Sequence, residues 1–156
     1  MISADVVSED NLWNKKIKKK DIFFNSLLSF FPKKYKFIKN KISLTVLLSN
    51  NKNIKVLNKK FRKKNKPTDV LSFPSEKKFN IKKSPYIGDI VISYEFMNEP
   101  KTQSNWQFKS NVTKIFIHGF LHLIGYDHIK AKDFKKMLTE EQKIYKTIKT
   151  KIVKLV

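Results

Sequence analysis

Cysteine is absent from this chain, glycine occurs three times and arginine once. Without cysteine the protein forms neither disulfides nor thiolate metal sites. Long apolar runs are missing as well, because the longest uncharged stretches, 22–32 and 115–126, are shorter than the roughly 20 residues of a membrane-spanning helix. The first residues, 1–6, lack the basic and apolar regions of a secretion signal. We therefore expect a soluble cytoplasmic protein with no membrane partner.

Acidic residues are few, since 13 Asp and Glu stand against 34 Lys and Arg, for a formal net charge of +21. Part of this excess reflects a composition rich in Lys, Ile, Phe and Asn. A domain of such charge nevertheless attracts polyanions through the release of counterions. The charge therefore favours a nucleic-acid partner, with a merely solvated basic surface as the alternative.

Hydropathy patterning predicts strands and helices in an irregular order. We expect strands at 2–7, 42–48, 69–73 and 89–93, and helices at 10–31, 54–61, 111–124 and 131–151. Asp69 and Asp89, which begin two of these strands, should each cap a turn or satisfy backbone donors. The chain 1–156, with 40% apolar residues and no interdomain linker, is expected to form a single α+β domain with a small mixed β-sheet. Its helices should surround a buried central helix, 111–124, which is apolar around most of its circumference.

The last predicted helix, 131–151, combines an apolar face with one acidic residue. We expect that face to comprise Phe134, Met137, Leu138, Ile144, Tyr145, Ile148 and Ile152. Glu141 is expected among Phe134, Met137 and Leu138 on this face, an unusual place for a carboxylate. Its carboxylate either orients a metal-binding imidazole or reaches solvent at the edge of the face.

All three histidines of the chain, His118, His122 and His128, lie in the string HGFLHLIGYDH. The first two are four residues apart and therefore share one face of the predicted helix 111–124. Gly125 would end that helix with a left-handed cap and let the chain return the third imidazole. Three neutral imidazoles with an open fourth position describe a catalytic zinc site better than a structural one, although they also suit nickel or copper. Core histidines bonded to carbonyl groups are the alternative.

Gly119 follows the first histidine and is expected to leave space for a ligand. The spacing HxxxHxxGxxH is also that of the metzincin peptidases, whose general-base glutamate would occupy position 119. A peptidase of that design would lack its base in this chain. Asp127, inside the motif, is a candidate base or a candidate support for a ligating imidazole.

The single arginine, Arg62, stands in a chain that otherwise uses lysine for positive charge. A guanidinium grips phosphate with two hydrogen bonds, which an ammonium does not reproduce. We expect Arg62 to bind nucleic-acid phosphates together with the neighbouring Lys59, Lys63 and Lys66. The alternative for Arg62 is that its identity is an accident of composition. The alternative for the lysines is that they form a solvated basic cluster.

Four segments occur in a recognisable order: 58–62, TDVLSFP, GDIVIS and HGFLHLIGYDH. Together they resemble the YbeY family of bacterial rRNA maturation factors, which are metal-dependent endoribonucleases, and the likeness spans nearly the full chain. It implies a zincin-like α+β fold, one zinc ion held by the three histidines, and Arg62 as a functionally important arginine. Met137 and Glu141 fit the family's Met-x-x-x-Glu pattern. The acidic residues that are common in the family after the third histidine are mostly replaced in this chain, at 129–132. Contacts that acidic residues of that region make in the family are therefore not expected in this protein.

The resemblance also implies a cellular role. It points to maturation of the 3′ end of small-subunit rRNA, to ribosome quality control, and to contact with a small-subunit ribosomal protein and a ribosome-assembly GTPase. We therefore predict a zinc-dependent endoribonuclease for single-stranded rRNA, with His118 and Arg62 as catalytic residues. Arg62 would hold phosphate and stabilise charge in the transition state. The alternatives are an rRNA-binding assembly factor with a structural metal, and a zinc peptidase.

Overall fold

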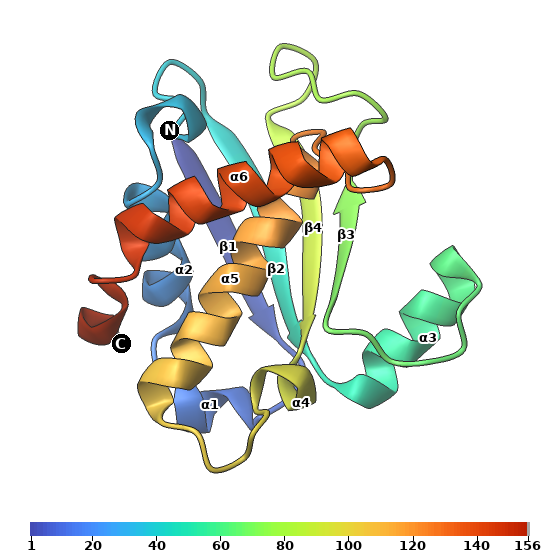
Figure 1. Cartoon of the computed structure of the whole chain (residues 1–156), viewed down its shortest axis with the longest axis vertical. Helices are drawn as coiled ribbons and strands as arrows, with labels where there is room; N and C mark the ends of the chain where they lie inside the picture. Colours follow the sequence, from blue (N-terminus) through green and yellow to red (C-terminus); the bar gives the residue numbers. More distant parts are fainter. Residues whose placement is uncertain (156) are drawn as a thin grey trace.

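A four-stranded mixed sheet organises the fold in a computed structural model that describes residues 1–155 (Figure 1). The strands are β1 (Ile2–Ser8), β2 (Ile42–Ser49), β3 (Val70–Pro74) and β4 (Tyr86–Ser93), in the order β1-β2-β4-β3. The pairs β1–β2 and β2–β4 are parallel, and β3 runs antiparallel to β4. The predicted α+β class with a small mixed sheet is confirmed.

Six α-helices surround the sheet within residues 1–155. They are α1 (Trp13–Lys16), α2 (Lys20–Ser29), α3 (Asn51–Arg62), α4 (Tyr94–Met97), α5 (Asn105–Leu123) and α6 (Ala131–Ile148), with 3₁₀ turns at Lys33–Tyr35 and Ile152–Lys154. In Figure 1, α6 crosses α5, which lies against the sheet. None of the helices in this described part of the chain is both long and apolar enough to cross a bilayer.

The central helix is α5, as predicted, but it begins six residues earlier than expected. Ser104 caps its start by accepting a hydrogen bond from the Gln107 N–H. Phe108, Phe116 and Phe120 are completely buried along it. These rings, together with the inward side chains of the sheet, form the main core.

The predicted helix 10–31 is wrong, because the chain makes two helices, α1 and α2, with a break between them. Ile17 adopts an extended conformation, with φ −131° and ψ 102°. Trp13 donates from its indole N–H to the Ser49 carbonyl oxygen at 2.8 Å, and both Trp13 and Ile17 are completely buried. A tertiary anchor therefore overrides local helical periodicity, and the change of direction brings Phe23 and Phe24 into the core.

The predicted apolar face of the last helix is partly wrong. Phe134 and Leu138 are 52% and 40% exposed. The buried positions of α6 are Met137, Glu140, Ile144 and Ile148. The helix is turned so that a carboxylate, Glu140, occupies an interior position where the pattern predicts apolar residues.

The two faces of the sheet are covered unequally. Gly119 of α5 packs against Ile90 and Ser72 on one face. Leu71 and Val91 alternate with those residues along β3 and β4, so their side chains point to the other face, where they form a small cluster with Ile54 of α3. Helices α5 and α3 therefore lie on opposite faces, and we call the face on the side of α3 the open face.

Candidate metal centre

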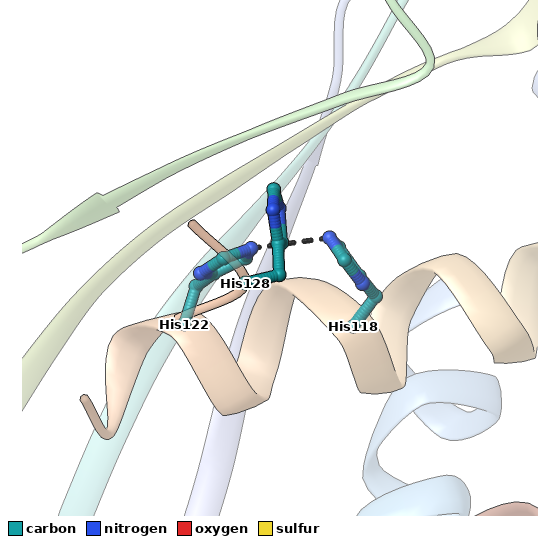
Figure 2. A group of neighbouring side chains, drawn as sticks. All are labelled: His118, His122 and His128. Atoms are coloured by element: carbon teal, nitrogen blue, oxygen red, sulfur yellow. Dashed lines mark hydrogen bonds between the residues drawn. The ribbon is translucent and has the colours of Figure 1, made fainter. Parts of the chain in front are cut away.

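The C-terminal end of α5 brings the three histidines together. His118 and His122 lie one turn apart on the helix, and His128 returns from the following loop to face them (Figure 2). Gly125, with φ +100°, makes that return. Its N–H donates to the His122 carbonyl oxygen, and the Tyr126 N–H donates to the Leu121 carbonyl oxygen, which is the hydrogen-bond pattern of a Schellman cap. The predicted left-handed cap is observed.

The three imidazoles converge on one point. Each offers a nitrogen, and these nitrogens all lie within 4.8 Å of one another. Ring centroids are 4.7 Å apart for His118 and His122, 4.9 Å for His122 and His128, and 5.5 Å for His118 and His128. His128 is exposed and the other two are half-buried. The triad is able to hold a metal ion with one side open to solvent.

Hydrogen bonds determine which nitrogens face the metal position. His118 Nδ1 is 2.6 Å from a carboxylate oxygen of Glu141, and His122 Nδ1 is 2.9 Å from the Tyr126 carbonyl oxygen. Both partners accept hydrogen bonds, so both Nδ1 atoms carry protons and both Nε2 atoms carry lone pairs. These two Nε2 atoms face each other at 3.1 Å. Two ring nitrogens at that distance share either a proton or a metal cation.

Two of the three donors have the separation expected of ligands to one metal ion such as zinc. Tetrahedral zinc with Zn–N bonds of roughly 2.0–2.1 Å separates two ligating nitrogens by about 3.3 Å, close to the observed 3.1 Å between the Nε2 atoms of His118 and His122. Burial first, and the neighbouring His118 second, lower the pKa of His122 below its ordinary value. This shift keeps the imidazole neutral, which is the form that binds metal.

The two predicted supporting carboxylates have different environments. Glu141 contacts His118, which is the arrangement in which a carboxylate fixes the orientation of a ligating imidazole. Asp127 instead accepts a hydrogen bond from the His128 backbone N–H at 2.7 Å, and it is exposed. It shapes the backbone beside the third histidine rather than holding a ring.

Gly119 has a different role from the expected one. It is buried, and a Cβ atom added there would lie 2.8 Å from Ile90 Cγ2 and 3.1 Å from Ser72 Oγ. The residue therefore allows close contact between α5 and the sheet and leaves no space for a ligand, so this expectation is wrong. Any side chain at position 119 would begin against Ile90 and Ser72 of the sheet.

The basic residues singled out in the sequence lie elsewhere. Lys59 and Arg62 are exposed in the last turn of α3, and Lys63 and Lys66 are exposed just after it. Lys63 ends the helix in the left-handed conformation, with φ 60°. The structure gathers this basic group at the end of α3, which packs on the open face, whereas the histidines belong to α5 on the other face and to the loop after it.

Sequence reasoning missed a polar network behind the metal position. Tyr35 donates its hydroxyl hydrogen to Glu140, whose carboxylate also lies 3.0 Å from the Lys34 ammonium. The Tyr126 hydroxyl lies 3.4 Å from that of Tyr35. The network joins α6 to the loop that carries His128. Its residues are far apart in the sequence. Only Tyr126 belongs to a motif, the histidine string, that marked it as close to the site.

Comparison with known proteins identifies the chain. The family model described as Endoribonuclease YbeY matches residues 7–149. This chain belongs to the YbeY family. The protein named Endoribonuclease YbeY in Pelagibacter ubique (strain HTCC1062) is 74% identical to it over 152 residues, which are 97% of this chain and 99% of the relative. The protein of that name in Fusobacterium nucleatum is 41% identical over 103 residues, which are 65% of this chain and 64% of the relative.

A solved structure of similar fold supports the assignment. The solution structure of TM1509 from Thermotoga maritima superposes with a TM-score of 0.58 at 26% identity, over 95% of this chain and 89% of that one. The predicted family resemblance is confirmed. YbeY membership also confirms the prediction of an enzyme, a hydrolase of the nuclease class.

Proposed function

We propose that the protein is a zinc-dependent endoribonuclease that cuts single-stranded rRNA at the histidine triad. The observation that supports it most is the pair of opposed Nε2 lone pairs of His118 and His122, each fixed by a hydrogen bond on the other side of its ring. Zinc, when bound, supplies Lewis-acid activation of water or of a phosphate oxygen. Family membership supports RNA as the substrate.

The residues of the chain supply position and charge. Glu141 and the Tyr126 carbonyl oxygen hold the imidazoles of His118 and His122 in one tautomer. Exposed His128 leaves the site open to a substrate. His118 is the catalytic ligand in this proposal because its ring lies between the metal position and Glu141.

Arg62 acts on the RNA at a distance from the triad. Helix α3 lies on the open face of the sheet and α5 lies on the other face. Since β3 is the edge strand beside both helices, an RNA strand that contacts both would pass around the outer edge of β3. Arg62, Lys59, Lys63 and Lys66 would bind phosphates of the strand before or after the cut. This placement favours phosphate binding over direct contact with the reacting phosphate.

The cellular role follows from the family. We propose that residues 1–156 form one endoribonuclease domain that matures the 3′ end of small-subunit rRNA and serves ribosome assembly and quality control in the cytoplasm. Its partners would include a small-subunit ribosomal protein and a ribosome-assembly GTPase. The match over residues 7–149 supports this assignment.

A cleavage assay tests the proposal. Metal-assayed wild type, His118→Ala and Arg62→Ala are incubated with a defined rRNA 3′ fragment, and the ends are mapped. We expect EDTA to stop cleavage, zinc to restore it, and His118→Ala to be inactive. Arg62→Ala should retain zinc and cut only at higher RNA concentration, while Lys149→Ala, at the far end of α6, serves as the matched charge control.

The outcome separates the alternatives. Undiminished cleavage after removal of the metal would contradict the mechanism. Loaded wild type that binds the fragment without cutting it would instead support an assembly factor with a structural metal. Cleavage of peptides but not RNA would support the peptidase, which lacks its general base because position 119 is a glycine packed against the sheet.

A further inference from the structure

The open face of the sheet carries a pocket that the metal centre does not use. Helix α3 covers only the part of this face around Ile54, Leu71 and Val91. Beside it lies a pocket of about 510 Å³, which is within the range of small-molecule sites. Its lining includes Thr45, Leu47, Leu57, Phe61, Phe73 and Asp89. We call it the open-face pocket.

The wall of the pocket is aromatic and solvent-accessible. Phe61 of α3 is 55% exposed, and its ring packs edge-on against Phe73 of β3, with centroids 5.1 Å apart and an interplanar angle of 67°. Leu47 and Leu57 are only partly buried beside them. An exposed aromatic ring beside these leucine side chains is a surface on which a flat ring can stack.

The floor of the pocket is polar and has a defined order. The strand register places Asp5, Thr45, Asp89 and Phe73 side by side across β1, β2, β4 and β3. The Tyr86 hydroxyl donates to Asp89 and lies 2.8 Å from Thr45 Oγ1. Asp89 therefore does not satisfy backbone donors as its sequence position predicts. Its second carboxylate oxygen remains to accept a hydrogen bond from a ligand.

The surroundings of the pocket are strongly cationic. The Lys60 ammonium lies 5.2 Å from the centroid of the Phe61 ring. Arg62 and Lys63 follow Phe61 directly in the chain and are exposed. An RNA phosphate bound by these side chains would bring its own nucleotide next to the aromatic wall.

We propose that the open-face pocket binds one unpaired nucleobase of the RNA, stacked against Phe61 and hydrogen-bonded to Asp89. The carboxylate accepts N–H groups, so it selects bases with an exocyclic amino group. Uracil is disfavoured because its single ring N–H lies between two carbonyl oxygens, which the carboxylate repels. The inference rests on the proposed RNA substrate and adds to it a binding site remote from the metal.

Binding to short oligonucleotides tests the proposal. The full-length zinc-loaded protein is titrated with 2′-O-methyl oligomers of adenosine, of uridine and of abasic sugar phosphates, and their integrity is verified afterwards on a gel. Methyl resonances of Leu47 and Leu57 report a ring in the pocket. We expect the adenosine oligomer to shift both resonances and to bind about tenfold more tightly than the abasic one, as stacking of one base predicts.

Two pocket variants and one control on α3 separate binding in the pocket from general affinity for RNA. Phe61→Ala should remove the advantage of adenosine over the abasic oligomer, whereas Val56→Ala, 63% exposed on the same helix, should leave it unchanged. Asp89→Asn should reduce the preference for adenosine over uridine, because an amide both donates and accepts hydrogen bonds. Thermal unfolding of each variant confirms that it is folded.

The results distinguish the pocket from the proposed function. Equal binding of adenosine and abasic oligomers, with leucine methyl resonances unmoved, would overturn the pocket while RNA cleavage at the triad stands. Cleavage-inactive protein that binds no oligomer at all would overturn both. Leucine resonances that respond to a ribosomal protein but to no oligonucleotide would also overturn the nucleobase assignment, since they would identify a protein-docking surface.

Discussion

The Nε2 atoms of His118 and His122 face each other at 3.1 Å, while Glu141 and the Tyr126 carbonyl oxygen hold the opposite nitrogens. The protein therefore holds these two nitrogens at about the separation of two ligands to one cation. A ligand that binds only the folded state at 100 times its dissociation constant adds about 2.7 kcal/mol, which for a domain of this size raises Tm by roughly 5–10 °C. We expect this rise when zinc is added to metal-free protein and followed by calorimetry. His122→Ala should show no comparable rise and no stoichiometric zinc.

Glu141 should control metal affinity without being a ligand. Its carboxylate accepts the His118 Nδ1 hydrogen bond at 2.6 Å. Removing such a partner weakens metal binding about 10- to 100-fold, so Glu141→Ala should show this loss in a competition titration with a chromophoric chelator. Glu141→Gln keeps an accepting oxygen and should lose less. Equal losses in the two variants would mean that the negative charge of the carboxylate, and not an accepting oxygen or packing at this position, is what matters.

Gly119 should resist substitution by alanine. Alanine normally stabilises a helix interior by about 1 kcal/mol relative to glycine. Here the added Cβ would lie 2.8 Å from Ile90 Cγ2 and would push α5 away from β4. Overpacking of this kind costs about 1–3 kcal/mol, so Gly119→Ala should lower the free energy of unfolding in urea. A stabilised variant would show that the helix and sheet can separate without cost.

The contact between Tyr35 and Glu140 should make stability depend on pH. Burial by itself would raise the pKa of Glu140, but the hydrogen bond from Tyr35 and the Lys34 ammonium outweigh it, so the pKa lies below its ordinary value. Such a group adds stability that is complete above the ordinary carboxyl pKa and is lost as pH falls through the lowered one. Tyr35→Phe should cost about 1.5–3 kcal/mol at neutral pH.

The pH dependence of stability provides a control for the contact between Tyr35 and Glu140. The deficit of Tyr35→Phe, measured by urea unfolding, should shrink between about pH 6 and about pH 3, because Glu140 becomes protonated in both proteins. Glu140→Gln removes the titrating carboxyl and should flatten the difference over this range. A deficit that is constant with pH would assign the effect to packing of the Tyr35 ring.

Arg62 should contribute one phosphate contact. Arg62→Ala is expected to reduce the slope of log K against log salt by about 0.7 for single-stranded RNA, with similar loss for all sequences. Arg62→Lys should recover the slope but not all of the affinity, because an ammonium lacks the bidentate fork. Zinc content should be unchanged in both variants, since α3 lies across the sheet from the triad. A loss of zinc would contradict that separation.

Features set by neighbours in the chain could be predicted from the sequence. Helical periodicity placed His118 and His122 on one face, and Gly125 provided the left-handed residue of the cap. Alternation of apolar residues located the strands to within a few residues. The break at Ile17 escaped prediction because the Trp13 hydrogen bond to Ser49 spans 36 positions of the chain.

The sequence by itself determined the family, the metal-binding residue types and the basic character of α3, because each depends on residue identity or short spacing. The tertiary structure alone decided that Gly119 faces Ile90 and that Glu141 reaches His118 while Glu140 reaches Tyr35. It also decided that α3, which carries Arg62, packs on the opposite face of the sheet from α5. These relationships depend on how the strands pair and how each helix is rotated about its axis. Both are determined by contacts between residues that are distant in the sequence, so local periodicity does not predict them.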